Sequence, residues 1–137
     1  SPSGSLFSIE FHQLLKSKLK PGGIVISQAG RTSINNLQYH ASIRATMAAV
    51  YKHTASFDRH IPFYGEPWGF VFASDQHRHD ELSANDIDLR LKDRGIQGQR
   101  CYTGSIHAAM FVQPPYFEQK LSELGKVHSD VNPLRVK

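Results

Sequence analysis

A tyrosine and a tryptophan stand close together in the stretch HIPFYGEPWGFVFASD, which runs from His60 to Asp75. Two apolar segments flank a short turn, Tyr64 to Pro67, and Trp68 follows directly. So short a connection predicts that the flanking strands are antiparallel. The two rings could form a binding platform at the tip of this hairpin, and ordinary packing is the alternative for each of them.

A glutamine lies near the end of a second apolar segment, GIVISQA, which spans Gly23 to Ala29. Its β-branched residues and lack of polar alternation predict a strand that is covered on both faces, as in a parallel sheet. Ligands bind outside the carboxyl ends of the strands in such sheets. We therefore expect Gln28, Tyr64 and the loop Ser1–Gly4 at one rim, with a solvated polar side chain as the alternative for Gln28.

Apolar residues at helical spacing predict the elements that position this rim. The expected order is a helix from about Ser5 to Leu19, the strand above, a helix from about Leu37 to His53, and hairpin strands at Ser56–Phe63 and Trp68–Ser74. The second strand is expected to run parallel to the first after a helical crossover. This order resembles the second half of an open α/β sheet that ends in an antiparallel hairpin.

Helices are also expected after the hairpin. Ser83 and Asp86 are spaced for a capping box, and Leu82 could pack on Ile87, so a helix begins here and ends near residues 94–95. A last helix is expected from residue 114 to Gly125. We therefore expect one domain over residues 1–125, followed by a frayed tail over residues 126–137.

Composition limits the classes of protein to consider. The 137 residues suffice for one modest core, and no apolar run approaches the ~20 residues that cross a bilayer. Ser1–Ser5 is small and polar, unlike a signal peptide. The single cysteine, Cys101, allows no internal disulfide and no thiolate metal site. We therefore expect a cytoplasmic protein without a membrane partner.

Two features could suggest other ligands. The net charge of +4 could favour nucleic acid, but the cations are scattered, and the group at Lys16, Lys18 and Lys20 ends a helix, where cations complement the dipole. Nucleic acid is therefore an unlikely partner. The cluster His77–Asp80 has metal-ligand residue types, yet it follows a strand in a charged loop, so we expect a solvated surface and no metal.

Three blocks in one order resemble the C-terminal half of the polyamine aminopropyltransferases, the spermidine, spermine and thermospermine synthases. The blocks are LFSIEFHQLLKSKLKPGGIVISQAG, IPFYGEPWGFVFASD and RCYTGSIHAAMFVQPPYF, and the resemblance covers roughly residues 2 to 121. The segments WGFVFASD and LSANDIDLRL resemble the thermospermine-synthase branch. The resemblance implies a partial Rossmann-like sheet of the class I methyltransferase type, with a C-terminal antiparallel hairpin and flanking helices.

The resemblance also implies a reaction and a set of contacts. Such enzymes transfer an aminopropyl group from decarboxylated S-adenosylmethionine to putrescine or a longer polyamine. A neutral amine attacks the carbon beside the sulfonium, and an acidic residue takes its proton. The matching substrate-binding residues are Gln28, Tyr64 with Pro62 in the I-P-x-Y turn, and Trp68 as the wall behind them. Pro2 and Gly4 match part of the D-P-x-G loop that closes over the site.

Several parts of the family pattern are missing from this sequence. These are the Gly-rich nucleoside loop, the ribose-binding acid, the N-terminal β-domain and the catalytic Asp, with Ser1 where the second Asp of D-x-x-D-P would stand. We therefore expect a fragment or truncated relative without a catalytic residue, without tight cofactor binding and without activity by itself. The alternative is a non-catalytic half-fold that pairs with itself, or with a complementary N-terminal half, to complete its sheet.

Overall fold

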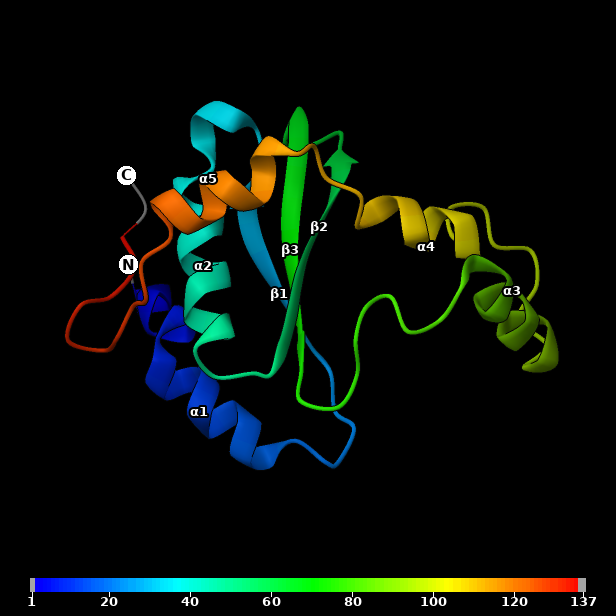
Figure 1. Ribbon diagram of the computed structural model, residues 1–137, viewed down its shortest axis with the longest axis horizontal. Coiled ribbons are helices and arrows are strands. Elements are labelled where there is room, and N and C mark those ends of the chain that lie inside the picture. The colour runs from blue at the N-terminus through cyan, green and yellow to red at the C-terminus, as the bar shows by residue number, and fades with distance from the viewer. Residues whose placement is uncertain (1, 136–137) are drawn as a thin grey trace.

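The computed structural model describes residues 2–135, apart from the side chains of residues 2 and 3 (Figure 1). The elements in chain order are η1 (Pro2–Phe7), α1 (Ile9–Lys18), β1 (Val25–Arg31), η2 (Ile34–Asn36), α2 (Gln38–Ala48), β2 (His53–Ile61), β3 (Glu66–Ser74), α3 (Ala84–Asp93), α4 (Gly104–Met110) and α5 (Tyr116–Leu124). Helical segments precede β1 and β2, β3 follows β2 directly, and the elements after β3 in the described part of the chain are helices.

The three strands form one sheet in the order β1-β3-β2, and both pairings are antiparallel. The expected hairpin is confirmed, although its last strand pair is Ile61 with Glu66, so the turn comprises residues 62–65. β1 and β2 run in the same direction, as expected, but they do not pair, because β3 lies between them.

The expectation that the first strand is covered on both faces is wrong. Val25 and Ala29 are buried, whereas Ile26 between them keeps 52% of its surface exposed. Among the described strands β1 pairs only with β3, so it forms one edge of the sheet. The isoleucines at positions 24 and 26 are apolar residues on the open face, and they conceal the alternation of a half-covered strand.

One face of the sheet is covered by helices. Figure 1 shows α1, α2 and α5 together on one side of the strands, with α3 and α4 standing out on the other side. The core between α2 and the sheet contains Ile43 and Met47 of α2 with Val71 of β3, all at most 1% exposed. Phe117 of α5 packs with Leu37 and Ala41 in a second cluster on the outer side of α2.

A buried histidine ties α2 to the sheet. His40 Nδ1 lies 3.2 Å from the Ala29 carbonyl oxygen, and its Nε2 lies 2.8 Å from Ser56 Oγ. Because a carbonyl only accepts, Nδ1 donates to Ala29, and Nε2 accepts from the Ser56 hydroxyl. Arg44 donates to the same Ser56 oxygen at 2.7 Å. Burial lowers the pKa of His40 from 6.5 to about 4, so the ring is neutral near pH 7.

The two helices after the hairpin pack on each other. The predicted capping box is confirmed, since Ser83 Oγ accepts from Asp86 N at 3.1 Å and Ser83 N donates to Asp86 Oδ2 at 2.9 Å. Helix α4 was not expected from the sequence, because seven residues are too few to show a helical period. Gly104 at its start packs against the Ala84 backbone and donates from its N to Asp88 Oδ1 at 2.7 Å.

The segment after α5 packs on the domain instead of fraying. Leu134 is 8% exposed and belongs to the core beside the sheet. The His128 carbonyl accepts from Ile9 N at 2.8 Å, and His128 N donates to Thr46 Oγ1 at 3.0 Å. Residues 126–134 therefore join α1 to α2, a role that their polar sequence does not reveal.

The buried His40 should make the fold sensitive to acid. The unfolded chain takes up this proton near pH 6.5 and the folded chain near pH 4, so stability that is present above pH 6.5 is lost as the pH falls towards 4. We expect the free energy of unfolding to fall by roughly 2.5 kcal/mol between pH 7 and pH 4.5 through this group. Urea unfolding at a series of pH values measures the loss.

The variant His40→Gln is the control for that measurement. It should be less stable at pH 7, since the ring no longer bridges Ala29 and Ser56, but its stability should depend less on pH. Some dependence remains, because burial also lowers the pKa of His12. An equally steep pH dependence in the variant would contradict the assignment to His40.

Candidate functional site

The open face of the sheet carries the residues that the sequence singled out. Val71 and Ser56 are buried towards α2, and side chains alternate along a strand, so Phe70 and Trp68 point to the open face. Residues directly opposite each other share a face. Gln28, Phe70 and Phe57 therefore form one row across the sheet, and the next row, nearer the hairpin tip, is Arg31, Trp68 and Arg59.

A bulge in β1 brings Arg31 onto this face. Gln28 and Arg31 are three residues apart, whereas their partners Phe70 and Trp68 are two apart, so β1 carries one extra residue here. Without it, alternation would turn Arg31 towards α2. Gly30 makes the bulge possible, because its φ is +70° and a Cβ would lie 2.7 Å from Tyr39 Cδ1.

The two rings of the hairpin tip stack on each other. The centroids of Tyr64 and Trp68 are 3.9 Å apart, with an angle of 18° between the planes. Tyr64 is held in the turn by its N, which donates to the Ile61 carbonyl at 2.9 Å, and the Pro62 carbonyl accepts from Gly65 N at 3.2 Å. Trp68 Nε1 is buried and donates to no group in residues 2–135.

Charges of both signs flank the stacked rings. Arg31 Nε lies 2.7 Å from Glu66 Oε1, and Ser33 donates to Glu66 Oε2 at 3.0 Å, so both carboxylate oxygens are engaged. Arg59, on the other side of Trp68, is exposed and makes no ion pair within the described part of the chain. Asp58 lies on the helix-covered face, where it accepts from Thr32 at 3.0 Å. This end of the open face is therefore not electronegative.

The structure brings together most of the expected site residues. Gln28 lies opposite Phe70 in the middle of β3, on the same face as Trp68, and Tyr64 stacks on Trp68. Gln28 is exposed, and its side-chain amide forms no hydrogen bond within the described residues. Pro62 is in the same turn. The sequence analysis missed Arg31, although Gly30 directly after the apolar segment was a signal of a bulge.

The expected closing loop lies elsewhere. Gly4 is buried in η1, and its neighbours are Pro133 and Leu134, with a Cβ at this position 3.0 Å from the Leu134 carbonyl oxygen. Its described contacts do not include the hairpin tip. Pro2 begins η1, and its side chain is outside the described part of the structure. The role of both residues as a gate over the site stays a prediction.

The metal-like cluster after β3 has other partners. His77 Nδ1 lies 2.6 Å from Glu81 Oε1, and Arg78 makes two bonds to Asp80 at 2.9 and 2.8 Å. Within residues 2–135 no group of three or more His, Cys, Asp or Glu side chains is arranged to hold a metal ion. None of the described helices is long and apolar enough to cross a membrane.

Comparison with known families identifies the domain. Residues 1–83 match the family model of the spermine/spermidine synthase domain. The chain belongs to the spermine/spermidine synthase family. It shares 33% identity over 134 residues with a polyamine aminopropyltransferase of Sulfolobus acidocaldarius, and 36% over 136 residues with one of Hyperthermus butylicus. Each alignment covers 98% of this chain but only 44% of the relative.

A plant relative and a solved structure also match most of this chain over less than half of their own length. The thermospermine synthase ACAULIS5 of Arabidopsis thaliana is 32% identical over 123 residues, which are 88% of this chain and 34% of the plant protein. The crystal structure of spermidine synthase from Thermotoga maritima superposes with a TM-score of 0.73 over 90% of this chain and 41% of that chain, at 20% identity. The predicted methyltransferase-type fold is confirmed, and this family member spans less than half the length of these relatives.

The bulge at Gly30 can be tested with a matched glycine. In Gly30→Ala the backbone strain at positive φ adds to a clash with the Tyr39 ring, whereas Gly65 has a φ of +69° and open space around it. We expect Gly65→Ala to cost about 1 kcal/mol and Gly30→Ala roughly 2–4 kcal/mol. Urea unfolding at pH 7 measures both. Equal losses would show that Tyr39 moves aside without cost.

Proposed function

We propose that this chain supplies the amine-binding side of an aminopropyltransferase and is inactive by itself. The full enzyme would transfer an aminopropyl group from decarboxylated S-adenosylmethionine to putrescine or a longer polyamine. The observation that carries the proposal is the stacked pair Tyr64–Trp68 on the same face as Gln28, in a chain of the spermine/spermidine synthase family. Most of the named relatives are polyamine aminopropyltransferases.

The stacked rings suit the substrate of such a reaction. Trp68 covers one face of the Tyr64 ring, and Tyr64 remains 40% exposed, so its ring and hydroxyl are open to a ligand. An ammonium group can lie over an aromatic face, and a phenol oxygen can accept from an amine. Gln28 adds an amide that can both donate and accept. These groups would orient an amine without supplying the charge that holds it tightly.

The charges near the rings support inactivity. The attacking nitrogen forms a bond to the carbon beside the sulfonium, the carbon–sulfur bond breaks with release of methylthioadenosine, and the nitrogen gives up a proton. A carboxylate normally receives that proton. Glu66 is the carboxylate at this end of the described open face, and Arg31 and Ser33 engage both of its oxygens. A base and a holder for the nucleoside would therefore have to come from residues outside this chain.

The proposal also covers the co-substrate, the need for a metal and the cellular compartment. One solved relative is a spermidine synthase in complex with the transition-state analogue AdoDATO, which fits a nucleoside-sulfonium co-substrate for the full enzyme. We expect this chain to bind that co-substrate only weakly and to need no metal. Cys101 is exposed as a free thiol, which suits a reducing compartment, so we place the protein in the cytoplasm.

Binding and turnover can be measured on the purified chain. Trp68 is its single tryptophan, so its fluorescence reports ligands at the rings. We expect spermidine to change this fluorescence with a Kd on the order of 1 mM, because the flanking arginines offset the attraction of a cation. With decarboxylated S-adenosylmethionine and spermidine together, chromatography should detect no methylthioadenosine above background.

Two tyrosine variants make the binding experiment specific. Tyr64 and Tyr116 are each 40% exposed, but Tyr116 lies on α5, which is on the helix-covered side of the sheet (Figure 1). Tyr64→Ala should raise the Kd at least threefold, and Tyr116→Ala should leave it unchanged. Equal affinity in all three proteins would argue against the amine site, and sustained turnover by the wild-type chain would contradict the proposed inactivity.

The alternative function is an interaction module, and the free edge of β1 favours it. Ile24 and Ile26 are 49% and 52% exposed, and no charged side chain lies between residues 24 and 30. An uncharged, unpaired strand edge is a ready partner for another strand. A second copy of this chain could pair β1 with β1 and extend the sheet across both copies.

Self-association through this edge can be tested by placing a charge on it. Ile26→Lys should shift a dimer of the chain to monomer in sedimentation equilibrium, because a lysine is costly to bury in a sheet contact. Ile34→Lys is the control, since Ile34 is 50% exposed but lies in η2, outside the strand. A wild-type chain that is monomeric at about 100 μM would remove the alternative.

A further inference from the structure

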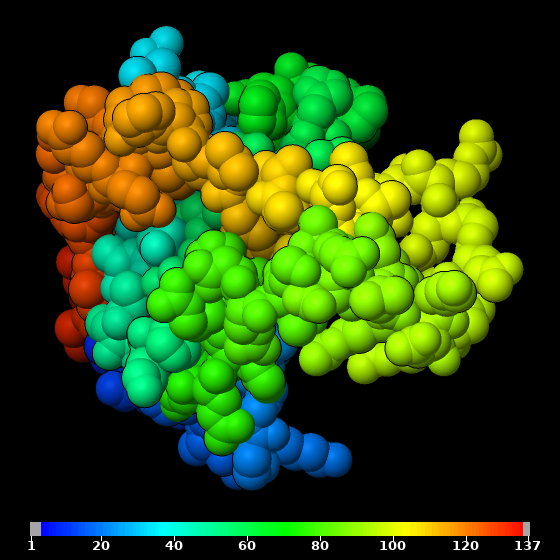
Figure 2. Space-filling view, turned by 45° about the vertical axis from the view of Figure 1, so that its right-hand side comes forward, coloured from blue at the N-terminus to red at the C-terminus, as the bar shows by residue number. Residues whose placement is uncertain are grey.

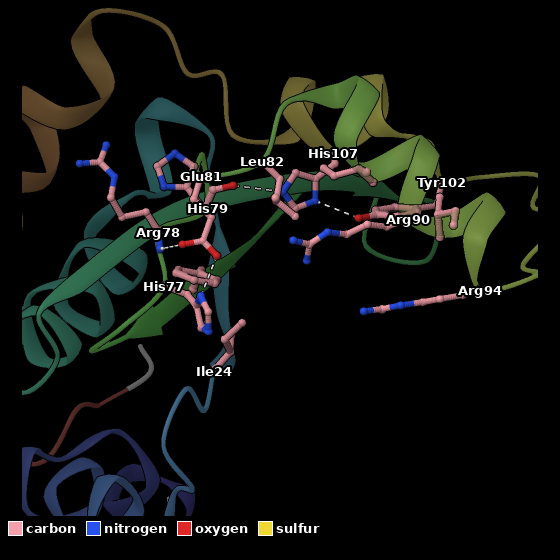
Figure 3. A pocket seen from close by; sticks show the side chains of 13 residues that line it. Ile24, His77, Arg78, His79, Glu81, Leu82, Arg90, Arg94, Tyr102 and His107 are labelled. Atoms are coloured by element: carbon pink, nitrogen blue, oxygen red, sulfur yellow. Dashed lines mark hydrogen bonds and ion pairs between the residues drawn. The ribbon is translucent and has the colours of Figure 1, made fainter.

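A cavity of about 240 Å³ opens at the other end of the sheet, between the strands and the α3–α4 segment. Figure 2 shows this segment as a separate part of the surface, standing out at the right of the molecule. Figure 3 shows the residues that surround the cavity. Ile24 directly precedes β1, and Phe72 lies near the end of β3, so the cavity is remote along the strands from Tyr64.

The floor of the cavity is apolar. Phe72 and Ile87 are each 7% exposed, and Leu82 and Leu91 beside them are half-buried. Ile24 forms the open side, where half of its surface is exposed. This lining comes from the sheet, the loop after β3 and one face of α3. A hydrocarbon group placed there would lose contact with water on several sides.

Two arginine side chains at the C-terminal end of α3 line the cavity. Arg90 and Arg94 are four residues apart and therefore lie on one face of the helix. Figure 3 shows both side chains extending from α3 in the same direction, towards the side of the cavity that Ile24 occupies. Neither guanidinium group makes a hydrogen bond or ion pair within residues 2–135, whereas Asp80 holds the guanidinium of Arg78 by two bonds.

The remaining polar groups around the cavity already have partners. His107 Nε2 lies 3.2 Å from the His79 carbonyl, so it donates there, and its Nδ1 accepts from the Tyr102 hydroxyl at 3.0 Å. The Glu81 carboxylate accepts from His77 at 2.6 Å and from Arg78 N at 3.2 Å. The guanidinium groups of Arg90 and Arg94 therefore stand beside an apolar floor with donors that no described residue uses.

We propose that this cavity binds a small carboxylate with a hydrocarbon body. Guanidinium forks match the two oxygens of a carboxylate, and bonds between charged partners are stronger than those between neutral ones. The apolar floor would cover the body of the ligand, and Arg90 and Arg94 would hold its head at the mouth. Sites for drug-sized ligands span roughly 300–1,000 Å³, so this cavity suits a smaller molecule.

The inference does not rest on the proposed function. No residue of the cavity belongs to the group at Gln28, Tyr64 and Trp68. Loss of spermidine binding and loss of carboxylate binding are therefore separate results, obtained with different variants and different probes.

Titration with sodium octanoate tests the proposal on the 137-residue chain. Methyl resonances of Ile24, Leu82, Ile87 and Leu91, followed by NMR, report on the cavity floor. We expect saturable shifts of these methyls with a Kd on the order of 1 mM, as befits a ligand of ten non-hydrogen atoms. The methyls of Ile34 and Val131, exposed outside the cavity, should not shift.

Charge variants of the protein and a ligand of opposite charge test whether Arg90 and Arg94 bind the carboxylate group. Arg90→Gln with Arg94→Gln should raise the Kd for octanoate about tenfold, because charged hydrogen bonds are lost. Lys92→Gln with Arg100→Gln removes the same charge from residues that do not line the cavity, so it should leave the Kd unchanged. Octylamine has the same chain and a positive head, and it should not shift the floor methyls.

The outcomes separate clearly. The proposal is supported if octanoate shifts the methyl resonances of the cavity floor saturably, and if its affinity falls only in the Arg90/Arg94 double variant. It is overturned if octanoate produces no floor shifts up to about 20 mM, if both double variants bind equally, or if octylamine binds as well as octanoate. All four arginine and lysine side chains are exposed, so circular dichroism should find both variants folded.

Discussion

The whole structure depends on one central strand that is hydrogen-bonded along both edges. Val71 of β3 faces Ser27 of β1 on one side and Ser56 of β2 on the other. Because side chains alternate along a strand, a slip of β3 by one residue would turn Val71 outward and Phe70 inward. The register of this strand therefore decides which residues contact α2 and which remain on the open face.

Aromatic side chains follow one another along β3 on the face opposite α2. Trp68 lies near the hairpin tip, Phe70 stacks on Phe57 with centroids 5.2 Å apart, and Phe72 meets Phe111 near the other end. The proposed amine site and the carboxylate cavity are thus placed at opposite ends of one strand. They differ in what surrounds the aromatic floor. Beside Trp68, Arg31 is paired with Glu66, whereas near Phe72 the guanidinium groups of Arg90 and Arg94 have no ion-pair partner among the described residues.

Local signals in the sequence predicted the hairpin and the Ser83 capping box. Predictions that depend on which elements pack against each other in the fold were less successful. The residues GIVISQA do not show that β1 lacks a second cover, since isoleucine suits a buried strand and an exposed edge equally by composition. The bulge at Gly30 depends on the approach of Tyr39 from α2. The seven residues of α4 depend on packing at Gly104, which periodicity over so short a window cannot reveal.

The contacts between the first and last described residues govern how this domain can be made. Asp130 N donates to Glu10 across 120 positions of sequence, and Leu134 completes the core beside β1. Contacts between residues so far apart in sequence form late in folding, because the entropy cost of closing a long loop comes before the contacts stabilise the chain. On the ribosome, α1 and the sheet would be synthesised well before the residues that close them. The nascent domain would expose its apolar surfaces until residues 126–134 had left the exit tunnel, and such exposed surface favours aggregation.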